Sequence, residues 1–349
     1  MIEKAGDKTV FLQEADELSS FINDKANELF AALKNLNKGS LGEGDHWNDY
    51  FFNHHLGNRL FFSIQNSAHI LYESVKICGK PLNAITAIDY GAGLGTLFML
   101  GGKLGLKRFD YNDYLPEWQN TAKLVCDKIG ARIQSYITGD INAVIDFAAK
   151  ENLQYDIIVS RNVIEHIYSL DKFYTALYQH NSSAVIYSTT TANYHNPVMK
   201  WYHMYIHKKF EKAYRQHRIN EIKKIQPAFS EEQLIRVAEV ARGKAQTDFK
   251  IAVEKFSLGE IIEKDSHLRT NSCDPVTGVW NEHLLTKHEY KEIINKAGFK
   301  MFYTSGYWDT HYQSSVKNTA GKLFNRLIKI AGKQSGVAFS PFVNVVAYN

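Results

Sequence analysis

A glycine-rich loop flanked by acids is the part of the 349-residue sequence best suited to chemistry. The run Asp89-Tyr90-Gly91-Ala92-Gly93-Leu94-Gly95 follows an apolar segment and precedes a helical pattern. Glycines let the backbone turn sharply and let a ligand approach without meeting a Cβ atom. The start of the helix adds free N–H groups. The loop is therefore a candidate nucleotide-type binding site.

The same loop departs from the pattern of a dinucleotide site. That pattern requires glycines at G-x-G-x-x-G, whereas Gly91 and Gly93 are followed by Gly95 and Thr96. Asp89 stands two residues before the first glycine. A carboxylate there would repel a pyrophosphate but could bind an ammonium group. S-adenosylmethionine is a ligand that carries such a group.

Two more acids follow the next predicted strands. Asp113 stands at the end of the second strand, where it could accept hydrogen bonds from both hydroxyls of a ribose. Asp110 is an alternative three residues earlier. Asp140, in Gly139-Asp140-Ile141, follows the third strand. There the carboxylate could hold an adenine amino group, and Ile141 could flank the ring.

Alternating strands and helices must position these residues. The predicted strands are 84–89, 108–112, 132–137, 155–160, 183–189, 299–306 and 342–348. Helical patterns lie among them at 94–104, 117–129, 141–151, 286–297 and 318–332, and YDIIVSRNVIEHI predicts the fourth strand and its helix. Such alternation predicts an α/β fold with a mostly parallel sheet that helices cover on both faces.

Helical segments precede and interrupt this α/β core. Residues 1–80 are predicted to form an N-terminal helical cap, with helices at 10–37 and 47–77, a break near Gly57 and a loop at 37–46. The cofactor-binding core spans 81–190. A helical insertion at 191–282 follows the fifth strand, with helices at 197–224, 229–246 and 249–256 and then a loop. The remaining residues, 283–349, complete the sheet.

The motif series AIDYGAGLGT, YNDY, GDI and YDIIVSRNVIEHI resembles that of class I, Rossmann-like S-adenosylmethionine-dependent methyltransferases, and within them the ubiquinone/methyltransferase-type group. A helix ending at AGF and a final PFVNVVAY strengthen the likeness, which covers about 84–190 and 283–349. It implies a seven-stranded sheet, S-adenosylmethionine as cofactor and S-adenosylhomocysteine as product. The residues it implies are Asp89, Gly91, Ala92 and Gly93 at the methionine end, Asp113 and Tyr114 at the ribose, Asp140 and Ile141 at adenine, and Asn162 near the amino acid or the acceptor.

Histidines are the candidate catalytic residues. Methyl transfer to a hydroxyl benefits from a general base, since alkoxide character must develop. His166 follows the fourth strand and His195 follows the fifth, and each could instead structure its loop. His203 and His207 have a spacing that can bind metal. No carboxylate flanks them in the sequence, so no metal is expected.

The residues after the fourth strand narrow the acceptor. The run SRNV lacks the N/D-P-P-[YF] of base amino methylases, the Pro-Cys of cytosine-type enzymes and the Asp-Asn of metal-dependent catechol-type enzymes. What remains is metal-independent methylation of oxygen, or alternatively nitrogen, on a small-molecule or glycan-type acceptor. Basic and aromatic residues interleave over 200–224, where they suit an anionic acceptor or form a solvated face. The alternatives are an RNA or protein methyltransferase using this basic insertion, and a non-catalytic cofactor-binding scaffold.

Composition sets the remaining expectations. A net charge of +4 gives a weak nucleic-acid footprint. Three separated cysteines without a C-x-x-C pair favour a reducing cytoplasm. The sequence shows neither the apolar core of a signal peptide nor a run of roughly 18 apolar residues, so a soluble protein is expected. Residues 318–333 form a basic amphipathic helix that could contact a membrane peripherally.

Overall fold

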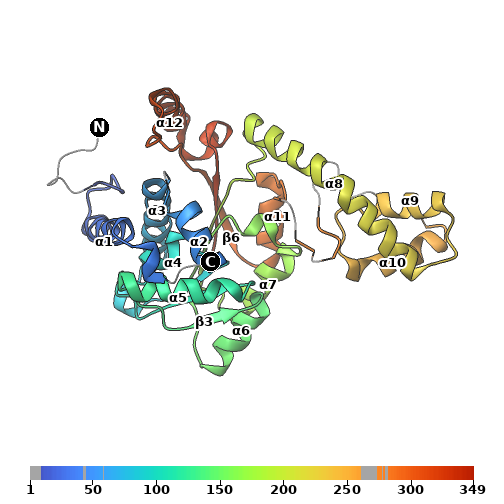
Figure 1. Ribbon diagram of the computed structural model, residues 1–349, viewed down its shortest axis with the longest axis horizontal. Helices are drawn as coiled ribbons and strands as arrows, with labels where there is room; N and C mark the ends of the chain where they lie inside the picture. The colour runs from blue at the N-terminus through green and yellow to red at the C-terminus, as the bar shows by residue number, and fades with distance from the viewer. Residues whose placement is uncertain (1–8, 42–44, 58, 261–272, 277, 280–281) are drawn as a thin grey trace.

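The computed structural model describes residues 9–41, 45–57, 59–260, 273–276, 278–279 and 282–349. Its centre is a seven-stranded sheet in the order β3-β2-β1-β4-β5-β7-β6 (Figure 1). Strands β1 to β5 pair in parallel, and β7 runs antiparallel to β5 and β6. The predicted seven-stranded, mostly parallel α/β sheet is confirmed. The strands are β1 (Thr86–Tyr90), β2 (Arg108–Asp113), β3 (Tyr136–Thr138), β4 (Ile157–Arg161), β5 (Val185–Thr190), β6 (Lys300–Ser305) and β7 (Val343–Tyr348).

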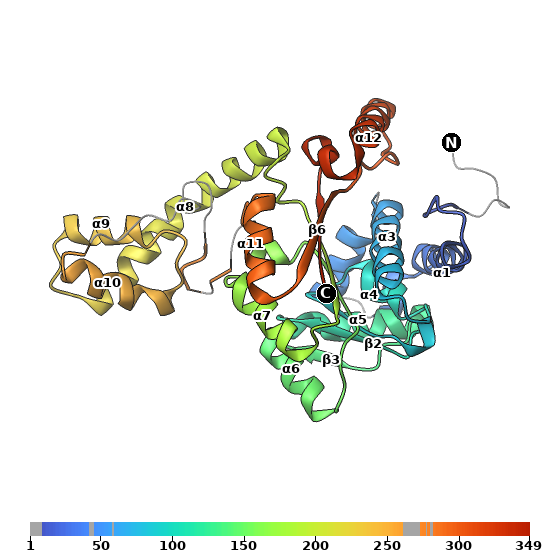
Figure 2. The same cartoon turned by 180° about the vertical axis from the view of Figure 1, so that it is seen from behind.

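Helices precede the sheet, connect its strands and follow β5 as an extended group (Figures 1 and 2). Those before β1 are α1 (Glu17–Lys34), α2 (His46–Tyr50) and α3 (Leu60–Cys78). Those among the parallel strands are α4 (Thr96–Gly101), α5 (Glu117–Ile129), α6 (Ile141–Lys150) and α7 (Leu170–His180). Those after β5 are α8 (Pro197–Ile225), α9 (Glu231–Val240), α10 (Phe249–Ser257), α11 (Lys287–Ala297) and α12 (Ser315–Ser335).

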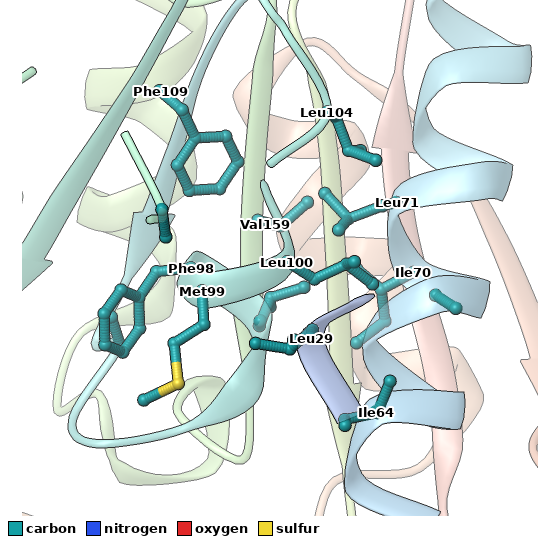
Figure 3. Packing of buried hydrophobic residues seen from close by; sticks show 14 of the residues in the cluster. Leu29, Ile64, Ile70, Leu71, Phe98, Met99, Leu100, Leu104, Phe109 and Val159 are labelled. Atoms are coloured by element: carbon teal, nitrogen blue, oxygen red, sulfur yellow. The ribbon is translucent and has the colours of Figure 1, made fainter. Parts of the chain in front are cut away.

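The central strands are buried on both faces, and their side chains alternate between two hydrophobic cores. One core joins one face of the sheet to α1, α3, α4 and α5, and Figure 3 shows part of it around Leu71, Leu100 and Val159. The other joins Ile88 and Ile158, each one residue from a member of the first core, to α6, α7 and α11. This two-sided packing fixes the carboxyl ends of β1 to β5 at one edge.

Local signals explain why several predicted boundaries match closely. Helix α5 ends before Gly130, which adopts a left-handed φ of 67° that glycine tolerates without a Cβ penalty. Helix α11 begins with a capping box in which Thr286 and Glu289 each bond the other's backbone N–H. Both devices are readable in the sequence, because they depend on residue type at fixed offsets.

Four predicted elements need correction. Helix α1 begins at Glu17 rather than 10, because Asp16 caps it and the N–H groups of Phe11 and Leu12 bond the side chain of Asn23 instead of helical carbonyls. Strand β3 begins at Tyr136 rather than 132, because the side chain of Gln134 accepts the Phe109 N–H bond at 2.7 Å that a ladder would use. No helix directly follows β4; Ile164–His166 form one 3₁₀ turn, since β-branched residues and a left-handed Asn162 disfavour a helix there. Helix α9 ends at Val240, well before the predicted 246, with Gly243 at a φ of 76° just beyond.

The helices after β5 build a small core of their own. The later part of α8 packs with α9 and α10 around a separate cluster that includes Ile222, Val237 and Phe249. This group extends away from the sheet in both views (Figures 1 and 2). The division into 1–80, 81–190, 191–282 and 283–349 stays a prediction. Parts of the loops expected at 37–46 and after 256 lie outside the described residues.

The helices that the structure describes include none with the combination of length and apolarity needed to span a membrane.

Candidate cofactor-binding site

The glycine loop connects β1 to α4 and is held against the end of β2. Gly91 and Gly93 have φ angles of 68° and 52°, which side chains rarely adopt. The Ala92 N–H donates to the Asn112 carbonyl at 2.8 Å, and the Tyr111 hydroxyl donates to the Gly93 carbonyl at 3.0 Å. These two hydrogen bonds hold the loop through its main-chain N–H and C=O groups.

Close packing also requires the two glycines. A Cβ on Gly91 would lie 2.7 Å from the methyl groups of Val163, in the loop after β4. A Cβ on Gly93 would lie 2.3 Å from the ring of Trp118, near the start of α5. The loop is therefore sandwiched between the β4 connection and α5, and neither glycine tolerates a larger residue in this arrangement.

Asp89, on β1 directly before the loop, is a buried carboxyl group with an unused oxygen. Its side chain is 1% exposed, and its Oδ2 has no hydrogen-bond partner among the residues that the structure describes. Burial raises the pKa of Asp89 well above its usual range, while the nearby Arg161 guanidinium opposes that rise. Burying a carboxyl oxygen without a hydrogen bond lowers the stability of the fold. The Oδ2 of Asp89 is therefore a candidate acceptor for a donor group on a ligand.

Arg161, the last residue of β4, lies near Asp89 and connects β4 to α3. Its guanidinium donates to the carbonyl and to the Oγ of Ser63 on α3, both at 3.0 Å. Burial lowers the pKa of Arg161, and the charge of Asp89 opposes that shift. Sequence reasoning did not select Arg161 as a site residue, although a charged residue ending an apolar strand was a usable signal.

Asp113, at the end of β2, contacts the glycine loop directly. Its Oδ2 accepts the Gly93 N–H at 2.8 Å, and its Oδ1 accepts the Leu115 N–H at 2.9 Å. Burial raises its pKa above the usual value, and these backbone bonds oppose the rise. Carboxylate oxygens can accept more than one hydrogen bond, so Asp113 is a candidate acceptor for an incoming hydroxyl. Asp110 instead bonds Arg108 and the Tyr155 hydroxyl through Oδ2, away from the loop.

The β3–α6 connection brings the third acid to the same edge. The Gly139 N–H donates to the Asp113 carbonyl at 3.0 Å, which ties the two strand ends together. Asp140 is the N-cap of α6 and accepts the Asn142 N–H at 3.0 Å. Ile141 follows as a buried residue, whereas Tyr114 beside Asp113 is 68% exposed. The structure thus places the predicted ribose and adenine residues next to one another.

Asn162 and His166 lie in the connection after β4. Asn162 is exposed, has a φ of 56°, and donates its N–H to the Thr189 carbonyl at 2.8 Å. His166 ends the 3₁₀ turn and is partly exposed. Between them Glu165 is fully buried, and burial raises its pKa to about 7. Asn162 therefore reaches the same edge of the sheet as the glycine loop.

His195 lies apart from the other predicted residues. Its Nε2 accepts the Lys287 N–H at the start of α11 at 3.0 Å, and its ring lies 5.8 Å from that of Tyr303 on β6. Burial lowers the pKa of His195, with the charges of Lys287 and Lys200 acting in the same direction. This bond supports the loop-structuring role of His195, and its catalytic role stays a prediction.

His203 pairs with a carboxylate, although none flanks it in the sequence. Its Nδ1 lies 2.5 Å from Oε2 of Glu282, and its Nε2 lies 2.9 Å from the Thr191 carbonyl. The two residues are far apart in sequence, so spacing alone could not reveal the pair. Across the described part of the chain, no three metal-ligating side chains of the His, Cys, Asp or Glu type gather in one place.

A cluster of aromatic rings from α2 and α5 packs beside the glycine loop. The Trp118 ring that faces Gly93 lies 5.6 Å from the ring of Trp47 and 6.1 Å from that of Tyr50, both on α2. Asn48, also on α2, accepts a hydrogen bond from the Thr121 hydroxyl of α5 at 2.8 Å. Helix α2 thus packs against α5 beside the loop, an arrangement that sequence periodicity did not indicate.

Two cavities lie away from the glycine loop. One of about 780 Å³ opens at the amino-terminal edge of the sheet, beside Lys80, Arg108 and Asp156. Another of about 330 Å³ lies between α3 and the β5–β7–β6 strands and includes His69 and Tyr307. Neither is lined by the glycine loop. The site is therefore recognised by its polar groups rather than by open volume.

No protein-family model and no curated protein matches the sequence. Solved structures give distant likenesses. The plantazolicin methyltransferase BpumL in complex with SAH is 12% identical, over 96% of this chain and 100% of that chain, with a TM-score of 0.38. An S-adenosylmethionine-dependent methyltransferase from Mesorhizobium loti is 12% identical, over 80% of this chain and 98% of that chain, with a TM-score of 0.39.

A third likeness is partial. SMU.776, complexed with SAH, is 10% identical over 38% of this chain and 37% of that chain, with a TM-score of 0.31. The chain thus spans little more than a third of the length of that relative. Likenesses at this level do not assign an activity to the chain.

Proposed function

We propose that the chain is an S-adenosylmethionine-dependent methyltransferase of the ubiquinone/methyltransferase-type group. The observation that carries the proposal is the buried Oδ2 of Asp89, which no described residue satisfies, beside a glycine loop that is followed by Asp113 at the end of β2 and by Asp140 at the N-cap of α6. An ammonium group, a ribose and an adenine need a carboxylate, a hydroxyl acceptor and an amino acceptor in that order. The residues present fit the cofactor.

Each residue has a definite part in holding the cofactor. Asp89 would bind the ammonium group, and the backbone of Gly91 to Gly93 would let the ligand approach closely. Asp113 would accept the ribose hydroxyls, while Asp140 and Ile141 would hold and flank the adenine. When bound, S-adenosylmethionine supplies an activated methyl group for in-line displacement. The protein's work is then alignment and exclusion of water.

We assign the reaction to metal-independent O-methylation of a small-molecule or carbohydrate-type acceptor that carries an anionic group. His166 is the candidate base, since it follows β4 near the methionine end. The cap, 1–80, and the insertion, 191–282, would close over the acceptor; in support, α2 of the cap packs against Trp118, the α5 residue beside Gly93. Basic residues along α8 supply the charge that an anionic acceptor needs.

The test is methyl transfer from labelled S-adenosylmethionine to fractionated pools of small acidic molecules and glycans. Label should appear in an acidic or sugar fraction and fall strongly for Asp89→Asn. His166→Gln should lower the turnover rate while leaving cofactor affinity unchanged. Label in RNA or protein would instead show that the acceptor is a macromolecule and would overturn the small-molecule or carbohydrate assignment. Tight cofactor binding without label in any pool would leave a cofactor-binding scaffold and contradict the enzyme proposal.

A further inference from the structure

Helix α12 carries an apolar stripe that faces away from the protein. Val316, Leu323 and Ile330 recur at every seventh position and are 76%, 56% and 84% exposed. Residues at this spacing lie on one helical face. The two buried residues of α12, Gly321 and Ile328, lie on the opposite face. The stripe is therefore not part of the hydrophobic core.

Basic residues flank this stripe, and of these Lys333 pairs with Glu73 of α3 at 3.2 Å. Helix α12 contains Lys317, Lys322, Arg326, Lys329 and Lys333 but no Asp or Glu. Lys322, Arg326 and Lys329 are exposed and fall along one side of the stripe at helical spacing. The regular part of α12, residues 315–331 before the non-helical Gly332, combines an apolar face, a basic flank and low mean hydropathy, which is the composition of helices that lie on membrane surfaces.

The first turns of α8 present a second surface of similar kind. Trp201 and Tyr205 are 69% and 61% exposed, with their rings stacked at 6.1 Å. Further along the same exposed side lie Lys208 and Lys212. The start of α8 and all of α12 lie at the same end of the molecule in both views (Figures 1 and 2). Trp and Tyr are the residues favoured at the boundary between lipid and water.

We propose that α12, with the first turns of α8, binds the surface of an anionic phospholipid bilayer. The aliphatic side chains would enter the boundary between headgroups and acyl chains, and the Lys and Arg side chains would contact anionic headgroups. This inference does not depend on cofactor binding, since it uses none of the cofactor-site residues, although the first turns of α8 also belong to the basic segment assigned above to the acceptor.

The chemistry of the surface favours lipid over other occupants. A second copy of α12 across the stripe would bring like charges together with no acid to pair them. RNA would contact the basic side chains, yet it offers nothing for Val316, Leu323 and Ile330. An anionic bilayer satisfies both the charge and the exposed aliphatic side chains.

The experiment is co-sedimentation of the full chain with vesicles of phosphatidylcholine alone and with roughly one third phosphatidylserine. The test variant is Leu323→Gln/Ile330→Gln. The matched control is Leu258→Gln, which alters an equally exposed leucine, 75% exposed, at the end of α10. Thermal unfolding of all three proteins checks that the exposed substitutions leave the fold intact.

The wild type and Leu258→Gln should bind the anionic vesicles, and added salt should weaken that binding. The double variant should partition about tenfold less, since two apolar side chains no longer enter the lipid. Absence of binding to anionic vesicles, or equal binding by the double variant, would overturn the proposal. Stripe-dependent dimerisation in sedimentation velocity, or RNA binding without vesicle binding, would also overturn it.

Discussion

Two acids at opposite edges of the sheet, the partly exposed Asp156 and the buried Asp89, differ in how their oxygens are hydrogen-bonded. At the amino-terminal edge, beside the cavity of about 780 Å³, Asp156 has both oxygens engaged, by Lys80 Nζ at 2.7 Å and by the Thr86 N–H at 2.9 Å. At the carboxyl-terminal edge no described cavity reaches the glycine loop, yet the buried Asp89 keeps an oxygen without a partner.

We infer from this contrast that Asp156 has a structural role, whereas Asp89 is a candidate ligand-binding residue. A carboxylate whose two oxygens are both hydrogen-bonded stabilises the fold and needs no ligand, even when a cavity lies beside it. An unsatisfied one lowers stability until a donor arrives, which is the usual relation between stability and function. Cavity volume would have pointed to the wrong edge, because aromatic side chains fill the space over the glycine loop.

Replacing the binding acid should have the largest effect. Asp89→Asn should weaken S-adenosylmethionine binding about a hundredfold, since one buried charge-assisted bond is lost. The same change should stabilise the empty protein by about 1 kcal/mol at neutral pH, because an unpaired buried carboxyl is removed. Calorimetric titration and thermal unfolding measure the two. Lower affinity together with lower stability would instead indicate a structural role.

The pH dependence follows from the raised pKa of Asp89. A group whose pKa is higher in the folded state contributes stability below its unfolded pKa, and this contribution is lost as pH rises through the folded value. The empty protein should therefore lose stability across that window, and Asp89→Asn should not. Cofactor affinity should rise with pH over the same range, because the ammonium group needs the ionised carboxylate. Melting curves and titrations at several pH values check both signs.

A methyl group on the loop should have the next largest effect. Gly93→Ala should lower cofactor affinity at least tenfold and destabilise the fold by about 2 kcal/mol, because the new Cβ meets Trp118 and φ is positive. Gly105→Ala is the matched control, with a φ of 68° and nothing within 4 Å. It should cost about 1 kcal/mol and leave binding unchanged. Equal binding losses in both variants would contradict the close approach.

The aromatic cover should give a smaller effect. Trp118→Phe should lower cofactor affinity about fivefold, since the large ring beside the loop becomes smaller. Tryptophan fluorescence of the wild type should shift on cofactor addition, and most of that shift should vanish in the variant. Trp308→Phe, in the segment after β6 and beside Phe324 of α12, should retain the shift. A full signal in Trp118→Phe would place the ligand away from Gly93.

The amino-terminal edge should give the smallest effect. Lys80→Ala removes an ion pair whose lysine is 53% exposed, so screening limits the loss to about 0.5 kcal/mol. Cofactor affinity should not change. Denaturant unfolding and the same titration test this. A binding loss here would mean that the two edges are not independent.

The order of elements was readable from the sequence because apolar runs and turn residues act locally. The α5 boundaries and the α11 capping box follow from residues within a few positions of one another. The acids at strand ends were readable for the same reason. Parallel strands bring their carboxyl ends to one edge, so order along the chain predicted nearness in space.

What the sequence could not predict depends on distant contacts. The Trp47–Trp118 cover, the Arg161–Ser63 bonds and the His203–Glu282 pair each join segments with no local signal. The bond from Lys287 to His195 is of the same kind and bears on the choice of base. Tertiary packing, rather than residue type, decides which polar groups are satisfied.

The central claim is tested most directly by calorimetric titration of the wild type and Asp89→Asn with S-adenosylhomocysteine, which lacks the reactive methyl group but keeps the ammonium. The account predicts micromolar binding by the wild type, a loss of about a hundredfold in the variant, and a variant at least as stable as the wild type. Undiminished binding by Asp89→Asn, or no binding by the wild type, would contradict it.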